Sequence, residues 1–155
     1  MKNFIKPILA FAAILLISLE VSAAPTAKSP EDVIGLWKTS SGDGIVETYK
    51  ENDKFFGKIV WIKEPKDKNG NPKTDLKNPN QKLQKEPIVG LVNLKDFKFN
   101  SNGKWEDGKI YDPSNGKEYS CEMKLSDEET LEVRGYMGFT WIGRTEVWKK
   151  QTQLP

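Results

Sequence analysis

Histidine is absent from the 155-residue chain, and cysteine occurs once. Without imidazole there is no serine–histidine or cysteine–histidine nucleophile, no imidazole acid–base group, and no histidine-ligated zinc, copper or haem. A single cysteine can form neither an intramolecular disulfide nor a thiolate cluster that holds a metal. These absences exclude several catalytic and metal-binding classes, and we expect neither a metal nor an organic cofactor.

The net charge is also small, because 24 lysines and arginines are balanced by 22 acidic residues. A nucleic-acid footprint needs a basic face on a clearly basic domain, whereas the lysines here are spread along the chain. We therefore expect no nucleic-acid partner. Two of the basic residues are arginines, Arg134 and Arg144, and these positions are expected to need a planar cation that can stack on a ring.

Long hydrophobic runs are limited to the first residues of the chain. Two lysines precede an apolar run at 8–19, and small residues follow it, which is the three-part pattern of a secretory signal peptide. The run is shorter than the roughly 20 residues that a membrane-spanning helix needs. We expect a signal peptide at 1–23, a flexible lead-in at 24–32, and a periplasmic or secreted protein without stable membrane insertion.

From residue 33 onward the sequence consists of short β-branched and aromatic runs separated by Gly, Asn, Asp and Pro. This spacing is typical of an all-β sandwich or barrel, and no stretch has a convincing helical period. The pattern predicts a single domain at 33–150 and a short tail at 151–155. The strands are expected at 33–39, 44–51, 54–63, 88–99, 103–111, 117–125, 129–137 and 139–149.

Two neighbouring runs, 117–125 and 129–137, alternate strictly between apolar and polar residues, so they are expected to share one apolar face. In 54–63 the same spacing places Trp61 on the face of Ile59, and Ile62 on the other face. Cys121 on an inward face is expected to be an inert thiol. The side chains expected to line the lumen, unless it is a packed core, are Trp61, Tyr119, Cys121, Met123, Leu131, Val133 and Met137.

Ser101 and Ser114 are each followed three positions later by lysine, which is the spacing of serine acyl-enzymes. Asn-Gly lies between the two residues in both cases and favours a turn, so we expect turns and not a catalytic site. Asp112 and Gly116 are interpreted as structural residues of the second turn. The alternative for Asp112 is a carboxylate presented at the mouth of a barrel.

The segment 64–87 is the longest connection, with four prolines and few apolar residues. Loops of this length are usually functional or disordered, and we expect a lid-like segment over one end of the domain. Within it, Asp67 and Asp75 superficially resemble calcium ligands, but the glycine and glutamate that the EF-hand spacing requires are missing.

Gly35 and Trp37 are expected to be structural residues of the first strand, and Arg144 of the last. The first and last strands of a barrel meet, so we expect the Arg144 guanidinium over the face of Trp37, a cation–π contact worth about 0.5 to 2 kcal/mol.

Six motifs resemble an exported bacterial family that is catalogued as domain-of-unknown-function family number 2147. The chain differs from the family at 148–150, where W-K-K replaces a frequent W-x-R. The resemblance implies an up-and-down antiparallel β-barrel of about eight strands, similar to lipocalins or streptavidin, and carries over no catalytic residue. The motifs are G-L-W at 35–37, F-F-G-K-I-V at 55–60, D-x-x-N-P at 75–79, G-K-I-Y-D-P-S-N-G-K-E-Y-S-C at 108–121, V-R-G-Y-M-G at 133–138 and G-R-T-E-V-W at 143–148.

An apolar lumen in a small barrel predicts an exported lipocalin-like protein that binds a small lipophilic molecule. The alternative is a filled barrel that acts as an interaction module, with the loop 64–87 in contact with an envelope protein. An enzyme is not expected, although a histidine-free hydrolase or isomerase that uses carboxylates with Tyr or Lys remains a third alternative. The sequence leaves the oligomeric state open.

Overall fold

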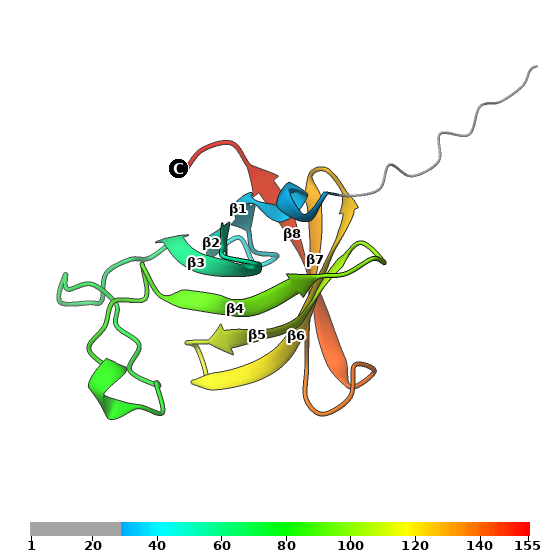
Figure 1. Ribbon diagram of the computed structural model, residues 1–155. Coiled ribbons are helices and arrows are strands. Elements are labelled where there is room, and N and C mark those ends of the chain that lie inside the picture. Colours follow the sequence, from blue (N-terminus) through cyan, green and yellow to red (C-terminus); the bar gives the residue numbers. More distant parts are fainter. Residues whose placement is uncertain (1–28) are drawn as a thin grey trace, which may run out of the picture.

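The computed structural model describes residues 29–155, so the expected signal peptide at 1–23 and most of the lead-in lie outside the described residues. Eight antiparallel strands follow one another in chain order around a closed barrel, and β8 pairs with β1 (Figure 1). The predicted eight-stranded up-and-down barrel is confirmed. The strands are β1 Gly35–Lys38, β2 Gly44–Glu51, β3 Lys54–Ile62, β4 Val92–Phe99, β5 Lys104–Asp112, β6 Lys117–Asp127, β7 Thr130–Tyr136 and β8 Gly143–Gln151.

Every expected strand has an observed counterpart, and two of them begin four residues later than predicted. β4 starts at Val92 because 88–91 belongs to the preceding loop, where Gly90 has a left-handed backbone with φ 102°. β8 starts at Gly143 because 137–142 forms a turn around Gly138, whose φ is 74°. In both cases an apolar sequence was assigned to a strand although glycine allows the chain to turn there.

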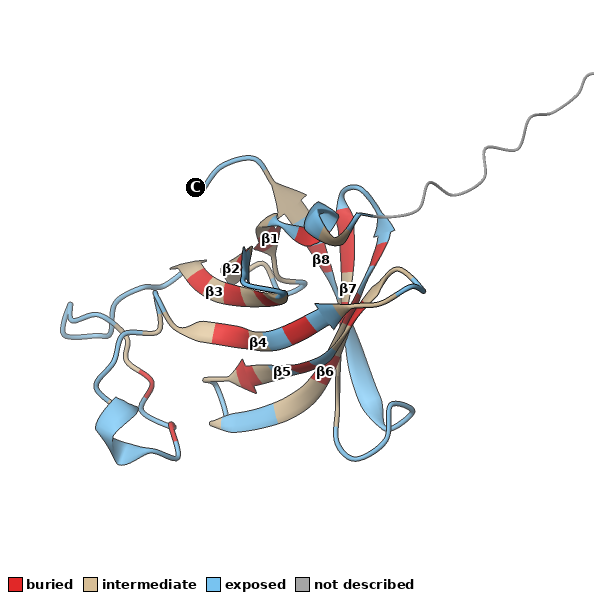
Figure 2. Cartoon of the chain, viewed as in Figure 1, coloured by how far each residue is buried: buried red, intermediate tan, exposed pale blue. Residues whose placement is uncertain are grey.

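One end of the barrel is filled with side chains. Figure 2 colours the buried residues of the strands red. The short 3-10 helix η1, Pro30–Val33, packs against this end. The Trp37 indole N–H donates to the Val33 carbonyl at 2.8 Å, and the Trp105 indole N–H donates to the Pro30 carbonyl at 3.1 Å. The core contains Val33, Trp37, Phe55, Leu94, Phe97, Trp105, Cys121, Met123, Leu125, Leu131 and Trp148.

Lys150, and not Arg144, supplies the cation that faces Trp37. The Lys150 ammonium lies 5.6 Å from the ring centroid, and the register pairs Trp37 with Lys150 across β1 and β8. Arg144 stands at the opposite end of β8, where its side chain is 87% exposed. The expected Arg144–Trp37 contact is therefore wrong. Antiparallel pairing places the C-terminal end of β8, and not its first residues, beside Trp37 of β1.

Candidate functional site

A cavity of about 850 Å³ occupies the barrel end opposite η1, where the loops 39–43, 63–91, 113–116 and 137–142 meet. Its volume falls in the range of small-molecule sites. The aliphatic walls come from Val46, Ile59, Ile62, Ile88, Ile110 and Val133, and three tyrosines, Tyr111, Tyr119 and Tyr136, complete them. Burial raises the pKa of the Tyr136 hydroxyl, so this group is a neutral donor near pH 7. The barrel is thus filled at one end and hollow at the other.

Charged side chains also line the cavity: Asp43, Asp112, Arg144 and Glu146. Arg144 is largely exposed and lies 3.9 Å from Glu146, and Asp43 belongs to the exposed β1–β2 turn. The mouth is therefore polar, whereas the walls are mainly aliphatic and aromatic.

The structure divides the residues that were expected to line the lumen into three groups. Tyr119, Val133 and Met137 line the cavity. Cys121, Met123 and Leu131 face inward but belong to the filled end. β6 runs away from the mouth, so each step of two residues along its inner face moves a side chain deeper into the core.

Trp61 is the seventh of these residues, and it does not line the cavity. The pairing of β2 with β3 shifts between Ile45 and Val46, which oppose Trp61 and Ile59, so Val60 is left without a partner in the ladder. Such a bulge breaks the alternation of faces. Ile62 therefore reaches the cavity in place of Trp61.

Asn93 is a cavity residue with a buried polar atom that has no partner among residues 29–155. It lies near the start of β4, is 6% exposed, and lines the cavity. Its Oδ1 is buried and has no hydrogen-bond partner among residues 29–155. Buried polar atoms are almost always paired, and an unpaired one costs about 1 to 3 kcal/mol. Asn93 is thus suited to receive a hydrogen-bond donor from a bound molecule.

The long loop between β3 and β4 is fastened to the cavity wall. Asp75 is fully buried, and its carboxylate accepts hydrogen bonds from the Tyr111 hydroxyl at 2.9 Å and from the Asn78 amide at 2.7 Å. Burial, with the Asp75 carboxylate as a second cause, raises the pKa of Tyr111 to about 12. Ile88, near the end of the loop, contributes to the cavity wall.

The loop also contacts the turn between β5 and β6. The Lys77 ammonium donates to the Ser114 carbonyl at 2.5 Å. The backbone of Gly116 passes so close to the Lys77 carbonyl that a methyl group at Gly116 would overlap the oxygen. The loop and the turn therefore form one packed rim on this side of the mouth.

Asp112 lies where both interpretations from the sequence place it, in a turn and at the cavity mouth. Its carboxylate accepts from the Ser114 backbone N–H and from the Asn115 amide, both at 2.8 Å, which are the bonds of a turn. It also belongs to the lining of the cavity mouth. The predicted turns are confirmed at both Ser–Lys pairs, where Gly103 and Gly116 have φ near 73° and 72°.

Asp67 closes a turn: its Oδ1 accepts the backbone N–H groups of Asn69 and Asn71 at 2.8 and 2.9 Å. In the part of the chain that the structure describes, no group of three or more His, Cys, Asp or Glu side chains could hold a metal ion. The Cys121 thiol is fully buried, and burial raises its pKa well above the usual range.

The closed antiparallel barrel of eight strands is a lipocalin-like fold. The chain belongs to the family described as uncharacterized protein conserved in bacteria (DUF2147), whose profile matches residues 35–150. The family resemblance noted in the sequence is thereby confirmed. Between residues 29 and 155, no helix is long and apolar enough to cross a membrane.

A solved structure with a similar fold is protein HP1028 from the human pathogen Helicobacter pylori, described as belonging to the lipocalin family. The two chains are 24% identical with a TM-score of 0.68, and the match covers 77% of this chain and 83% of that one. This likeness supports the fold. No curated protein matches the sequence significantly.

Proposed function

We propose that this chain is an exported bacterial binding protein that holds one small, largely apolar molecule in the hollow end of the barrel. The observation that carries the proposal is the unpaired Oδ1 of Asn93 beside a cavity with aliphatic walls. Such an atom is costly to bury, and a ligand that donates a hydrogen bond to it would remove the cost. The ligand class is therefore an apolar body with a hydroxyl or amide N–H group.

The mouth supports binding and not catalysis. The Asp75 and Asp112 carboxylates accept hydrogen bonds from neighbouring donors, and Asp43 and Glu146 pair with Lys63 at 4.0 Å and Arg144 at 3.9 Å. The Cys121 thiol lies in the filled end. A general acid or base must reach the reacting group, and a nucleophilic thiol must be accessible. Export is supported by the signal-peptide pattern of 1–23, and the family is bacterial.

Native mass spectrometry of the mature protein purified from its own periplasm tests the proposal directly. We expect a discrete excess mass that is lost on denaturation, and a polypeptide mass that begins at Ala24. Equal native and denatured masses, with no binding of the probes described below, would overturn the proposal and favour a partner protein for the loop 64–87.

Two matched probes test the ligand class. Dodecanol and dodecyl methyl ether have the same alkyl chain, but the alcohol alone has a donor. We expect the protein to prefer the alcohol by about fivefold, the ratio that corresponds to one hydrogen bond of about 1 kcal/mol. Asn93→Leu should abolish the preference, whereas Asn102→Leu, at the exposed turn between β4 and β5, should retain it. A wild-type protein that binds both probes equally would contradict the role of Asn93.

A further inference from the structure

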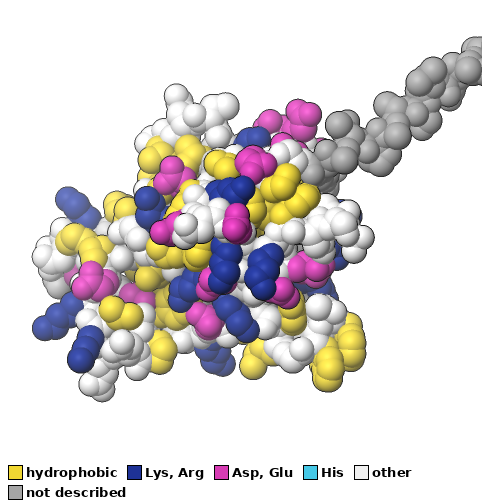
Figure 3. Space-filling view, viewed as in Figure 1, with side chains coloured by type: hydrophobic (Ala, Val, Ile, Leu, Met, Phe, Trp, Pro, Cys, Tyr) yellow, Lys and Arg dark blue, Asp and Glu magenta, His cyan; other side chains and the backbone are white. Residues whose placement is uncertain are grey.

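The turn 137–142 between β7 and β8 carries four exposed apolar side chains: Met137, Phe139, Trp141 and Ile142, with Trp141 72% exposed. The Phe139 and Trp141 rings stack on each other at 4.6 Å with an interplanar angle of 8°. Figure 3 shows hydrophobic side chains gathered at the lower right, over the place of this turn in Figure 1. Isolated exposed apolar residues are ordinary, but a contiguous group marks a contact surface. We call these four residues the apolar tip.

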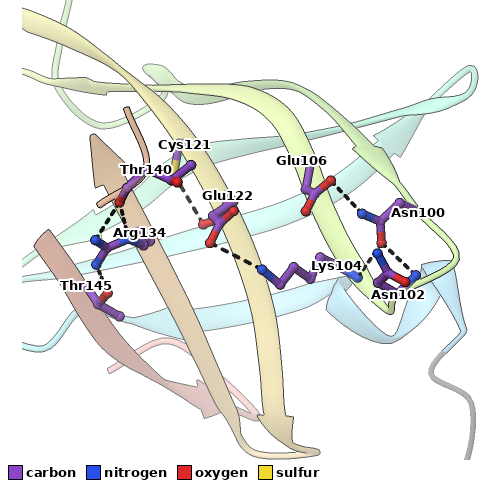
Figure 4. A network of polar contacts seen from close by, with 9 residues as sticks. All are labelled: Asn100, Asn102, Lys104, Glu106, Cys121, Glu122, Arg134, Thr140 and Thr145. Carbon is purple, nitrogen blue, oxygen red and sulfur yellow. Dashed lines mark hydrogen bonds and ion pairs between the residues drawn. The ribbon is translucent and has the colours of Figure 1, made fainter. Parts of the chain in front are cut away.

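The apolar tip is held in a defined shape. The Arg134 guanidinium donates to the Thr140 carbonyl from Nε at 2.8 Å and from Nη2 at 2.6 Å, and to the Thr145 hydroxyl at 2.9 Å (Figure 4). The Ile142 N–H donates to the Phe139 carbonyl at 3.0 Å. Because the turn is already ordered, presenting its aromatic rings to a partner costs little conformational entropy.

The charged residues that immediately flank the apolar tip in the sequence are both basic. Both arginines of the chain flank it, and Arg144 is largely exposed. The segment 137–144 contains no acidic residue, and the acid in contact with Arg144 is Glu146 at 3.9 Å. Arginine binds phosphate oxygens in a bidentate geometry.

The apolar tip is also continuous with the cavity, since Met137, Ile142 and Arg144 line its mouth. An apolar molecule that entered or left the barrel at this side would pass over the exposed rings. A surface that combines exposed aromatic rings with an adjacent arginine matches the interfacial region of a bilayer, where Trp and Phe lie at headgroup level.

We propose that the apolar tip docks the protein onto an anionic lipid bilayer, with Phe139 and Trp141 in the interface and Arg144 at the lipid phosphates. Docking places against the membrane the side of the cavity mouth that the β7–β8 turn forms. It goes beyond the proposed function, because it concerns an interaction surface and does not require that the cavity be occupied.

Flotation with vesicles of phosphatidylethanolamine and phosphatidylglycerol tests this proposal on the mature protein. We expect the wild type to float with the vesicles and its tryptophan emission to be quenched by brominated lipid. Phe139→Ser combined with Trp141→Ser should weaken vesicle binding by about tenfold or more, since two aromatic side chains lose their burial. The matched control is Ile34→Ser with Leu154→Ser, two exposed apolar residues outside the turn, and it should bind as the wild type does.

Arg144→Gln should weaken binding to these vesicles and have little effect on vesicles of phosphatidylcholine alone, because the latter lack net negative charge. Absence of wild-type flotation, or equal binding by the Phe139/Trp141 double variant, would overturn docking. A dimer in solution that the same variant dissociates would also overturn it, because a second copy would then cover the tip. Binding of the dodecanol probe without vesicle binding would reject docking and leave the proposed function intact. Vesicle binding without binding of the probe would support docking and contradict the proposed function.

Discussion

The hydroxyl of Tyr111 donates a 2.9 Å hydrogen bond to the carboxylate of Asp75, which lies 36 residues earlier in the chain and is fully buried. Tyr111 is part of the barrel wall, and Asp75 belongs to the long loop between β3 and β4. The bond therefore ties an irregular segment to a regular one at the edge of the cavity. A long loop that is fastened in this way is part of the folded unit at that rim.

Tyr111→Phe should lower the free energy of unfolding by about 1 to 3 kcal/mol, because it leaves a buried carboxylate oxygen with one donor fewer while the ring remains. Chemical denaturation measures the loss, and amide hydrogen exchange across 64–87 should become faster. Tyr49→Phe is the control, since Tyr49 is half-buried and stacks on Phe56 without a hydroxyl contact among the hydrogen bonds of residues 29–155. Equal effects of the two substitutions would contradict the fastening role.

The same bond predicts a pH dependence. The pKa of Tyr111 is about 12 in the folded protein against 10.0 for an ordinary tyrosine, so the folded state retains the proton more strongly than the unfolded chain. Its contribution to stability is then fully present below about pH 10 and is lost as the pH rises towards 12. Subtracting the denaturation profile of Tyr111→Phe removes the titration of other groups, and a flat difference between pH 9 and 12 would contradict this expectation.

Gly116→Ala should disturb the packing of the long loop on the β5–β6 turn. A methyl group there would overlap the Lys77 carbonyl in a backbone with φ 72°. Gly103→Ala is the matched control, because Gly103 has φ 73° but nothing within 4 Å of the added carbon. Both variants carry the left-handed strain of about 1 to 2 kcal/mol, so a larger loss of stability in Gly116→Ala measures the contact with the loop. Equal losses would mean that the loop adjusts freely.

Lys150→Met should destabilise the filled end by about 0.5 to 1 kcal/mol, since it removes the cation above Trp37 while it keeps most of the aliphatic stem. Arg144→Lys should leave the melting temperature unchanged, because the Arg144 side chain is exposed and makes one distant ion pair. Thermal unfolding of the two variants compares them directly, and a larger effect at Arg144 would contradict the observed register.

Alternation in the sequence predicted which faces of β6 and β7 point inward, because the side-chain period of a strand is fixed by its geometry. Alternation could not predict how far along the barrel axis each inward side chain lies. Tyr119 and Cys121 were therefore both assigned to the lumen, although Tyr119 lines the cavity and Cys121 belongs to the core. The bulge that turns Ile62 and not Trp61 towards the cavity could not be predicted from the residue types. Asn93 did leave a signal, as the single amide in the apolar run 88–94, but its lack of a partner depends on packing between distant segments.

Because the barrel has a filled end and a hollow end, selection for stability and selection for ligand specificity act on different residues. Substitutions around the rim can alter which molecule is held while the tryptophan-rich end continues to hold the chain above the stability that folding requires. A protein built in this way can diversify its specificity in small steps, and relatives with the same scaffold need not share a ligand.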